Sequence, residues 1–421
     1  MSMRSSRLPA LTVLVFVILS AGLYFLDSSE KGRSSSGGAT KQGEAPENPA
    51  LAALPGDDPE SALEGIFAEI EANRLNAALQ RVEDLIGRYP TFRLAHLIKG
   101  DLLLARARPL SGFGAMENAP AEKVADLRAE AVARLKGYRF RPSAENVPRY
   151  LLRMRDDQRY AIVIDTTKSR LYLYRNENGR PRFEMDFYMT QGRLGAGKFA
   201  EGDKRTPIGT YHVTSFLPPE KLPDLYGHGA FPINYPNEWD KRRGRGGSGI
   251  WLHGTSSDTF SRPPKASDGC VVLANPDFDR LGTLVQVGLT PVIISSEVEW
   301  LSPNAWQQER QELDTSIEAW RADWESLDTE RYLDHYSPDF KSGGQDFAAF
   351  ARQKRAVNRG KAWIKVKLDR LAVFRNPGPE DLAVVTFDQV YESSNLSNTM
   401  KKRQYWQKEN GRWKIIYEGA A

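Results

Sequence analysis

The sequence predicts a multidomain protein with an N-terminal α-helical region, a central mainly-β domain and a C-terminal α+β cone. Apolar residues recur at helical spacing over residues 59–136, short β-type runs begin at Tyr160, and the pattern restarts with a helix after Leu301. The chain has 421 residues, of which 40% are hydrophobic and 27% charged. This composition and length predict about two to four folded domains.

Residues 1–27 predict a signal anchor. Arg4 and Arg7 precede an uncharged apolar run from Leu8 to Leu26, which is long enough to span a bilayer as a helix. A cleaved signal peptide usually has a shorter apolar core and an A-x-A-like cleavage site. We therefore favour a retained transmembrane helix over export after cleavage, with the body of the protein on the far side of the membrane.

The next two regions differ sharply in composition. Residues 28–58 are rich in Gly, Ser, Pro and Ala and predict a flexible linker. Residues 59–158 predict a helical domain, in which Leu63, Ile66 and Ile70 share one face. No second copy follows at a repeat period, so a role in packing or dimerisation is favoured over a peptide-binding repeat array.

Residues 159–297 predict a mainly-β domain. The pair Asn178-Gly179 predicts a hairpin turn, and Asn275 followed by Pro276 predicts the start of a short helix with Asn275 as its cap. Predicted strands cover residues 161–164, 171–174, 183–189, 249–253, 271–273 and 291–294.

Residues 303–421 predict two helical stretches followed by a long antiparallel sheet. Leu313, Ile317, Trp320 and Trp324 share one helical face. Helices followed by such a sheet predict an α+β cone. The predicted strands cover residues 363–374, 382–391, 402–406 and 413–417.

Charge and cysteine usage exclude several functions. The net charge of +4, from 58 basic and 54 acidic residues, is too small to predict a nucleic-acid partner. Cys270 is the only cysteine, which excludes an intrachain disulfide and a cysteine-rich zinc site. The remaining histidines show no metal-ligand spacing, so neither a metal nor a cofactor is predicted. A lone thiol is either a small buried hydrophobe or a reactive group.

Cys270 and His253 together suggest nucleophilic chemistry. His253 ends one predicted strand, and Cys270 comes 17 positions later, at the start of the next. An imidazole that accepts the thiol proton generates the nucleophilic thiolate. We therefore predict a depressed pKa for Cys270. Gly254 leaves room for a carbonyl that orients the imidazole, and Gly269 lets nearby amides hold an oxyanion.

Four segments in order resemble the L,D-transpeptidase catalytic domain. They are Gly202 to Tyr211, Leu252 to Thr255, Ser267 to Cys270, and Asn275 to Asp277. The resemblance covers residues 160–295 and implies a β-sandwich-like domain whose cysteine attacks peptidoglycan stem peptides. By position it makes Cys270 the nucleophile, His253 the general base, Gly254 the backbone orienter, and the Gly269 and Cys270 amides the oxyanion hole.

Substrate binding is assigned less directly. Ser267 matches the family Ser or Thr before the cysteine, whereas Asp268 stands where many members have His, and Val271 and Val272 stand where an Arg is common. We assign Ser267 and Asp268 to substrate binding. The basic loop with Arg243 and Arg245 is either a binder of stem carboxylates or a solvated loop.

The C-terminal region resembles the nuclear-transport-factor-2-like fold, on element order and on the segment Tyr336 to Phe340. Together with the helical region and the catalytic domain, it resembles the L,D-carboxypeptidases that set cell shape in some helical bacteria. The resemblance implies a periplasmic enzyme of cell-wall remodelling held at the inner membrane, with a homodimer or an envelope protein as a further partner of the helical and C-terminal domains.

Four functions follow from these expectations. The first is a cysteine acyltransferase that cross-links tetrapeptide stems through a thioester. The second is an L,D-carboxypeptidase that trims tetrapeptide to tripeptide, and the third is a hydrolase that releases protein bound to peptidoglycan. The fourth is a non-catalytic envelope scaffold.

Overall fold

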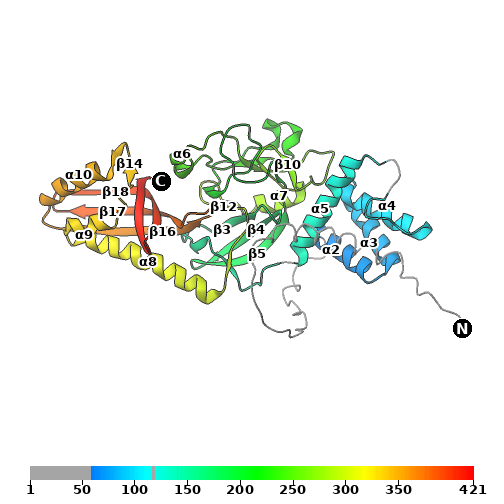
Figure 1. Ribbon diagram of the computed structural model, residues 1–421, viewed down its shortest axis with the longest axis horizontal. Helices are drawn as coiled ribbons and strands as arrows, with labels where there is room; N and C mark the ends of the chain where they lie inside the picture. The colour runs from blue at the N-terminus through cyan, green and yellow to red at the C-terminus, as the bar shows by residue number, and fades with distance from the viewer. Residues whose placement is uncertain (1–57, 116–118, 140) are drawn as a thin grey trace, which may run out of the picture.

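The computed structural model describes residues 58–115, 119–139 and 141–421. The predicted anchor lies outside these residues, as does the predicted linker except for Asp58. None of the helices in the described ranges combines the length and the hydrophobicity needed to cross a membrane. Figure 1 shows three parts in a row: helices at one end, a β-rich centre, and a helix-and-sheet domain at the other end. This arrangement confirms the predicted fold class.

The N-terminal part is a small bundle of four described helices. Asp58 caps the first of them by accepting a hydrogen bond of 3.0 Å from the Ser61 amide. Apolar faces at helical spacing meet in one core, which includes Leu63, Ile66 and Leu85. The helices are α2 (Pro59–Glu71), α3 (Leu75–Arg88), α4 (Arg93–Ala107) and α5 (Ala121–Arg139).

The helices end well before the predicted boundary at residue 158. The short strand β1 (Val147–Pro148) pairs with β13 (Trp300–Leu301). The strand β2 (Leu151–Arg153) joins the edge of the C-terminal sheet beside β16 (Ile364–Asn376). This pairing links residues more than 200 positions apart, which local sequence pattern does not reveal.

The central part contains a mixed five-stranded sheet in the order β5-β4-β3-β12-β7. The strand β12 runs parallel to β3 and antiparallel to β7. The predicted hairpin turn is present, because Asn178 and Gly179 both have positive φ values, 55° and 81°, as a type I′ turn requires. The strands are β3 (Tyr160–Asp165), β4 (Arg170–Glu177), β5 (Arg180–Tyr188), β7 (Gly209–His212) and β12 (Pro291–Ser295).

A second, smaller sheet packs against this one through a shared apolar core that contains Ile162, Leu252, Val271 and Phe278. Its strand order is β11-β9-β8, and a two-stranded pair of β10 with β6 lies beside it. The elements are β6 (Gln191–Gly192), β8 (Ala230–Pro232), β9 (Trp251–His253), β10 (Lys265–Ser267), β11 (Val271–Val272) and the helix α7 (Asn275–Gly282).

The C-terminal part is an antiparallel sheet in the order β19-β18-β17-β16-β2, covered by the long helix α8 (Pro303–Glu325). Trp320 of α8 is fully buried against Phe387 and Trp406 of the sheet. The other elements are α9 (Thr329–Asp334), α10 (Phe347–Arg359), β14 (Lys341–Ser342), β15 (Gln345–Asp346), β17 (Leu382–Ser393), β18 (Leu396–Glu409) and β19 (Arg412–Ala420).

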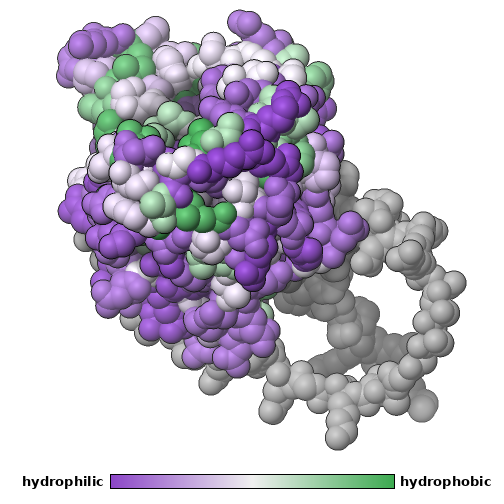
Figure 2. Space-filling view, turned by 90° about the vertical axis from the view of Figure 1, so that its left-hand side faces the viewer, coloured by the Kyte–Doolittle hydropathy of each residue, from purple (hydrophilic) through white to green (hydrophobic). Residues whose placement is uncertain are grey.

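The C-terminal domain has an open pocket of about 390 Å³ that is lined in part by Phe350, Lys354 and Glu418. Burial lowers the pKa of Lys354 to about 8, and its ammonium group lies 5.0 Å from the Trp324 ring centre. Figure 2 views the molecule from this end, which is mostly hydrophilic with smaller apolar areas.

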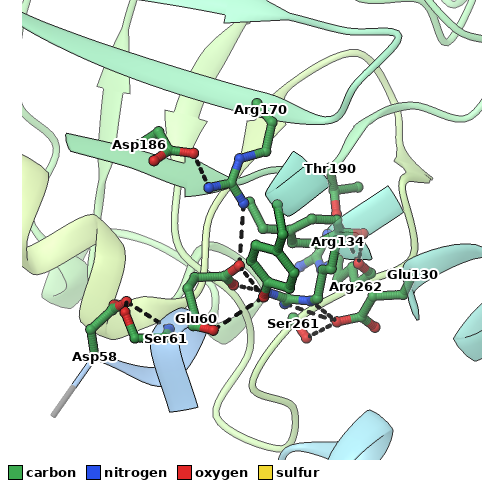
Figure 3. Close-up of polar contacts among 12 residues, drawn as sticks. Asp58, Glu60, Ser61, Glu130, Arg134, Arg170, Asp186, Thr190, Ser261 and Arg262 are labelled. Carbon is green, nitrogen blue, oxygen red and sulfur yellow. Dashed lines mark hydrogen bonds and ion pairs between the residues drawn. The ribbon is translucent and has the colours of Figure 1, made fainter. Parts of the chain in front are cut away.

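The helical bundle meets the central domain through buried charges rather than through apolar contact alone. Arg134 of α5 forms ion pairs with Glu60 and with Glu130, the second at 2.9 Å, and all three side chains are buried. Glu60 also pairs with Arg170 of β4 at 3.2 Å. Figure 3 shows these groups pointing toward one another across the boundary. A buried charge that loses its partner is costly, so the network favours one docking arrangement.

The second attachment at this boundary is aromatic. Phe260 belongs to the segment between β9 and β10, yet its side chain is buried in the core of the helical bundle. Its ring centre lies 4.3 Å from that of Phe92 and 5.0 Å from that of Tyr89. Its backbone amide donates a hydrogen bond of 3.2 Å to the Thr91 carbonyl oxygen. The bundle therefore holds a segment that belongs in sequence to the central domain.

We expect Phe260→Ala to lower the free energy of unfolding by about 3 to 5 kcal/mol, because it leaves a cavity in the bundle core. Denaturant unfolding followed by tryptophan fluorescence measures this change. The matched control is Phe199→Ala, since Phe199 is 60% exposed and should change stability by less than about 0.5 kcal/mol. Equal losses in the two variants would contradict the assignment of Phe260 as an anchor.

Candidate active site

The register of two short parallel strands brings Cys270 and His253 together. Val271 of β11 lies beside Leu252 of β9, and Val272 lies beside His253. Val271 and Leu252 point into the apolar core. Successive side chains of a strand alternate between its two faces, so Cys270 and His253 share the opposite face, on neighbouring strands and two positions apart. The register therefore places the two side chains on one face of the small sheet, and their direct contact stays a prediction.

The His253 ring is held in one tautomer. Its Nδ1 lies 2.6 Å from the Gly254 carbonyl oxygen. A carbonyl only accepts hydrogen bonds, so Nδ1 carries the proton and Nε2 keeps a free lone pair. Burial lowers the pKa of His253 to about 4, although the bond to Gly254 opposes this shift. The ring is therefore neutral at neutral pH and able to accept a proton at Nε2.

The Cys270 thiol is protonated at rest. Although Cys270 is partly exposed as a residue, burial of its thiol raises the pKa to about 11, against the opposing effects of the Trp251 amide and the Arg262 guanidinium. The thiol donates to the Gly249 carbonyl oxygen at 3.4 Å. No hydrogen bond joins it to His253 among the described contacts. The predicted depression of the pKa of Cys270 is therefore wrong, because burial outweighs the nearby positive charges.

Gly254 has no space for a side chain. A Cβ atom there would collide with Oδ1 of Asn275. Oδ1 accepts hydrogen bonds from the amides of Thr255 at 2.9 Å and His228 at 3.3 Å, and Nδ2 donates to the Thr255 carbonyl oxygen at 2.9 Å. Asn275 thus fixes the chain after His253. This corrects its predicted role as a helix cap, since α7 begins at Asn275 itself and has no side-chain cap bond.

Ser267 and Gly269 shape the turn before Cys270. The Ser267 hydroxyl donates to the Cys270 carbonyl oxygen at 2.6 Å and accepts from the Gly269 amide at 3.1 Å. The predicted oxyanion role of the Gly269 amide is therefore in conflict with this geometry, and the Cys270 amide is the predicted donor that remains. Gly269 has a φ of +128°, and the buried Thr206 hydroxyl donates to its carbonyl oxygen at 3.0 Å. These contacts hold Cys270 at its place on the strand.

The other predicted substrate-binding groups already have charged partners. Asp268 pairs with Arg193 at 2.9 Å on the surface. Arg243 pairs with Glu380 of the C-terminal domain, and Arg245 pairs with Asp240 at 3.2 Å. Both arginines therefore form ion pairs in this structure. Arg243 is exposed, so the loop is solvated at this position, and binding of stem carboxylates by the loop stays a prediction.

Sequence reasoning missed two residues near the site, Lys198 and Arg262, and placed a third, Tyr226, in a candidate lid or in turn and packing roles. Tyr226 of the 3₁₀ helix η3 (Asp224–Tyr226) places its ring centre 4.9 Å from the His253 ring. Lys198 is buried and pairs with Asp203 at 2.8 Å. Arg262 lies on the segment between His253 and Cys270, and its charge acts on the Cys270 thiol. Asp203 belongs to the predicted motif from Gly202 to Tyr211, and Lys198 lies a few positions before that motif.

Metal-ligating side chains do not cluster in the described ranges of the chain, where no group of three or more His, Cys, Asp or Glu could hold an ion. The groups that the candidate site does bring together are a neutral thiol, a neutral imidazole with a free Nε2, and backbone groups that hold both.

Comparison with known families agrees with this geometry. Residues 159–294 match the family model of the YkuD L,D-transpeptidase catalytic domain. Residues 312–419 match the model of the Cds6 C-terminal NTF2-like domain. The chain therefore belongs to the L,D-transpeptidase family, and it carries an NTF2-like domain after the catalytic domain.

Two solved structures are similar to this chain over nearly their whole length. Bd1075 of Bdellovibrio bacteriovorus is 30% identical, with a TM-score of 0.59, over 66% of this chain and 98% of that one. The helical cell shape determining protein Pgp2 of Campylobacter jejuni is 26% identical, with a TM-score of 0.56, over 64% of this chain and 95% of that one. A search of curated proteins gave no match.

The raised thiol pKa predicts slow alkylation of the native protein. Because the folded pKa of about 11 lies above that of a free cysteine, native Cys270 should react with iodoacetamide more slowly than the unfolded chain near pH 8.5. The native rate should still rise with pH up to about 11. Mass spectrometry after timed quenching measures both rates, with the urea-unfolded protein as the control. A native rate that levels off below pH 7 would contradict the protonated resting thiol.

Proposed function

We propose that this protein is a cysteine acyltransferase of the L,D-transpeptidase family that acts on peptidoglycan tetrapeptide stems. The observation that carries the proposal is the register of β9 and β11, which sets Cys270 and His253 on one face. The tautomer fixed by Gly254 supports it, because Nε2 is free to accept a proton. We further propose that the enzyme works in the periplasm, held at the inner membrane by the predicted N-terminal helix.

In the first half-reaction, the Cys270 sulfur attacks the carbonyl carbon of the peptide bond before the terminal D-residue. The thiol proton passes to Nε2 of His253 as the carbon–sulfur bond forms, so the thiolate need not exist in the resting enzyme. The imidazolium then gives this proton to the leaving nitrogen, and the D-residue departs. The product is a thioester between Cys270 and the shortened stem.

The second half-reaction decides between cross-linking and trimming. An amine of a neighbouring stem would give a cross-link, and water would give a tripeptide; in each case His253 takes a proton from the attacking group and returns it to the departing sulfur. The L,D-carboxypeptidase reading is the second candidate. The pairing of a catalytic domain with an NTF2-like domain supports it, since this pairing resembles cell-shape L,D-carboxypeptidases.

Product analysis tests the reaction. We expect the chain from Ser28 onward to remove the terminal residue of disaccharide tetrapeptide, and Cys270→Ala to lower the rate at least about 10³-fold. Mass spectrometry distinguishes a tripeptide product, which means trimming, from dimers, which mean cross-linking. Product formed equally by the wild type and Cys270→Ala would exclude the thioester route, and an inactive wild type would favour protein release or a scaffold role.

The pH dependence of kcat/KM tests His253 as the base. A base with a folded-state pKa of about 4 remains unprotonated through the range from pH 6.5 to 5, so activity should be lost only as the pH falls toward 4. An unshifted histidine would lose activity near pH 6.5. His253→Ala should abolish this limb and lower kcat/KM by about 10²- to 10⁴-fold. An acid limb near pH 6.5 in the wild type would contradict a buried neutral imidazole.

A further inference from the structure

Arg262 is held in place through its backbone. It lies on the connecting segment, which we define as residues 254–264 between β9 and β10. Its carbonyl oxygen accepts hydrogen bonds from the Tyr188 hydroxyl at 2.9 Å and the Thr190 hydroxyl at 3.0 Å. Two donors on one carbonyl fix the chain at this point. Figure 3 shows Arg262 beside Thr190 at the edge of the buried charge network.

The residues before Arg262 are held by the helical bundle. The Ser261 hydroxyl donates to Glu130 of α5 at 2.7 Å, and Phe260 fills the bundle core. Glu130 is in turn paired with Arg134. The position of Arg262 therefore depends on both the central domain and the helical bundle. The backbone that carries its side chain is fixed by contacts with each of them.

The Arg262 side chain reaches the wall of the candidate active site. Its Nη2 donates to the Leu225 carbonyl oxygen at 2.7 Å. Leu225 lies in η3, next to Tyr226, whose ring contacts both His253 and Trp251 at 4.9 Å between ring centres. The guanidinium charge also acts on the thiol of Cys270 and on the Tyr226 hydroxyl. The Arg262 charge is therefore near enough to the nucleophile to act on its thiol.

In the described part of the chain, the charge of Asp258 acts on Arg262, but the two side chains do not form an ion pair. No Asp or Glu there forms an ion pair with it, whereas Arg193, Arg243 and Arg245 each have one. A guanidinium has five N–H donors, and the described hydrogen bonds use one of them. A partly buried arginine with unused N–H donors is suited to bind a carboxylate through a planar, bidentate pair of hydrogen bonds.

We propose that Arg262 binds the terminal carboxylate of the stem peptide and so makes the site specific for a peptide end. This inference rests on the proposed function and names the group that the site recognises. In a peptide cut before its last residue, the carboxylate carbon is only three bonds from the carbonyl carbon that Cys270 attacks. A cation beside the thiol is therefore at the right place to hold it. Bound there, the carboxylate orients the scissile bond toward the sulfur.

A first experiment needs no peptidoglycan activity. Cys270 of the full-length protein is alkylated with anionic iodoacetate and with neutral iodoacetamide, and the ratio of the two rate constants is measured. Any change in thiolate fraction cancels in this ratio. Arg262→Gln should lower the ratio about fivefold or more, because it removes the cation that attracts the carboxylate, and Arg262→Lys should retain most of it. A ratio within about twofold of the wild type in Arg262→Gln would overturn the proposal.

The matched control is Arg93→Gln. This variant also removes one positive charge near the connecting segment, because Arg93 pairs at 3.0 Å with the exposed Asp258 of that segment. It should leave the ratio unchanged. A ratio lowered equally by Arg93→Gln and Arg262→Gln would mean a general charge effect and would also overturn the proposal. Circular dichroism of each variant checks that the fold is retained.

A second experiment compares the tetrapeptide with its C-terminal amide. The wild type should prefer the carboxylate by about 10²-fold in kcat/KM, and Arg262→Gln should reduce that preference to a few-fold, mainly through KM. An equal loss on both peptides would overturn the assignment of Arg262. If the wild type cleaves neither peptide, the proposed function fails, and the alkylation ratio still decides whether Arg262 binds an anion beside Cys270.

Discussion

The parallel pairing of β9 with β11 is the contact on which the site depends. It sets His253 and Cys270 on one face, but it also creates a topological demand. Parallel neighbours cannot be joined by a tight turn, so the chain must leave the end of β9 and return to the start of β11. The connecting segment makes this return, and it has little regular structure of its own. The helical bundle supports it by burying Phe260 and by binding Ser261.

The two ends of the catalytic domain are attached by different means. At the helical end, Glu60 of the bundle forms a buried ion pair with Arg170 of the central domain, so a misplaced bundle would break this pair inside the protein. At the C-terminal end, β2 adds a strand to the neighbouring sheet, and the loop that contains Arg243 forms ion pairs on the surface. Backbone pairing therefore sets the position of the C-terminal domain, whereas buried charges set the position of the helical bundle.

Much of the fold and the central pair could be predicted from sequence. The change from helical to β periodicity marks the domain order, and the spacing of His253 and Cys270 within known motifs identifies them as neighbours. Local pattern could not show that Phe260 enters a core formed near residue 92, because this contact joins distant segments. Arg262 belongs to no sequence motif. It stands out only in the described part of the structure, where other arginines form ion pairs with acidic side chains and Arg262 does not. The pKa of Cys270 was predicted in the wrong direction because charge is readable in sequence and depth of burial is not.

The protonated resting thiol has a chemical consequence for the lifetime of the protein. Peroxides and disulfides react with thiolates, and with a pKa of about 11 the thiolate fraction near pH 7 is roughly 10⁻⁴. An exposed low-pKa cysteine without a partner would be consumed by oxidation to sulfenic acid or by mixed-disulfide formation. With so small a thiolate fraction, Cys270 should react with these small reagents only slowly, and in the proposed mechanism the imidazole takes the thiol proton as the substrate is attacked.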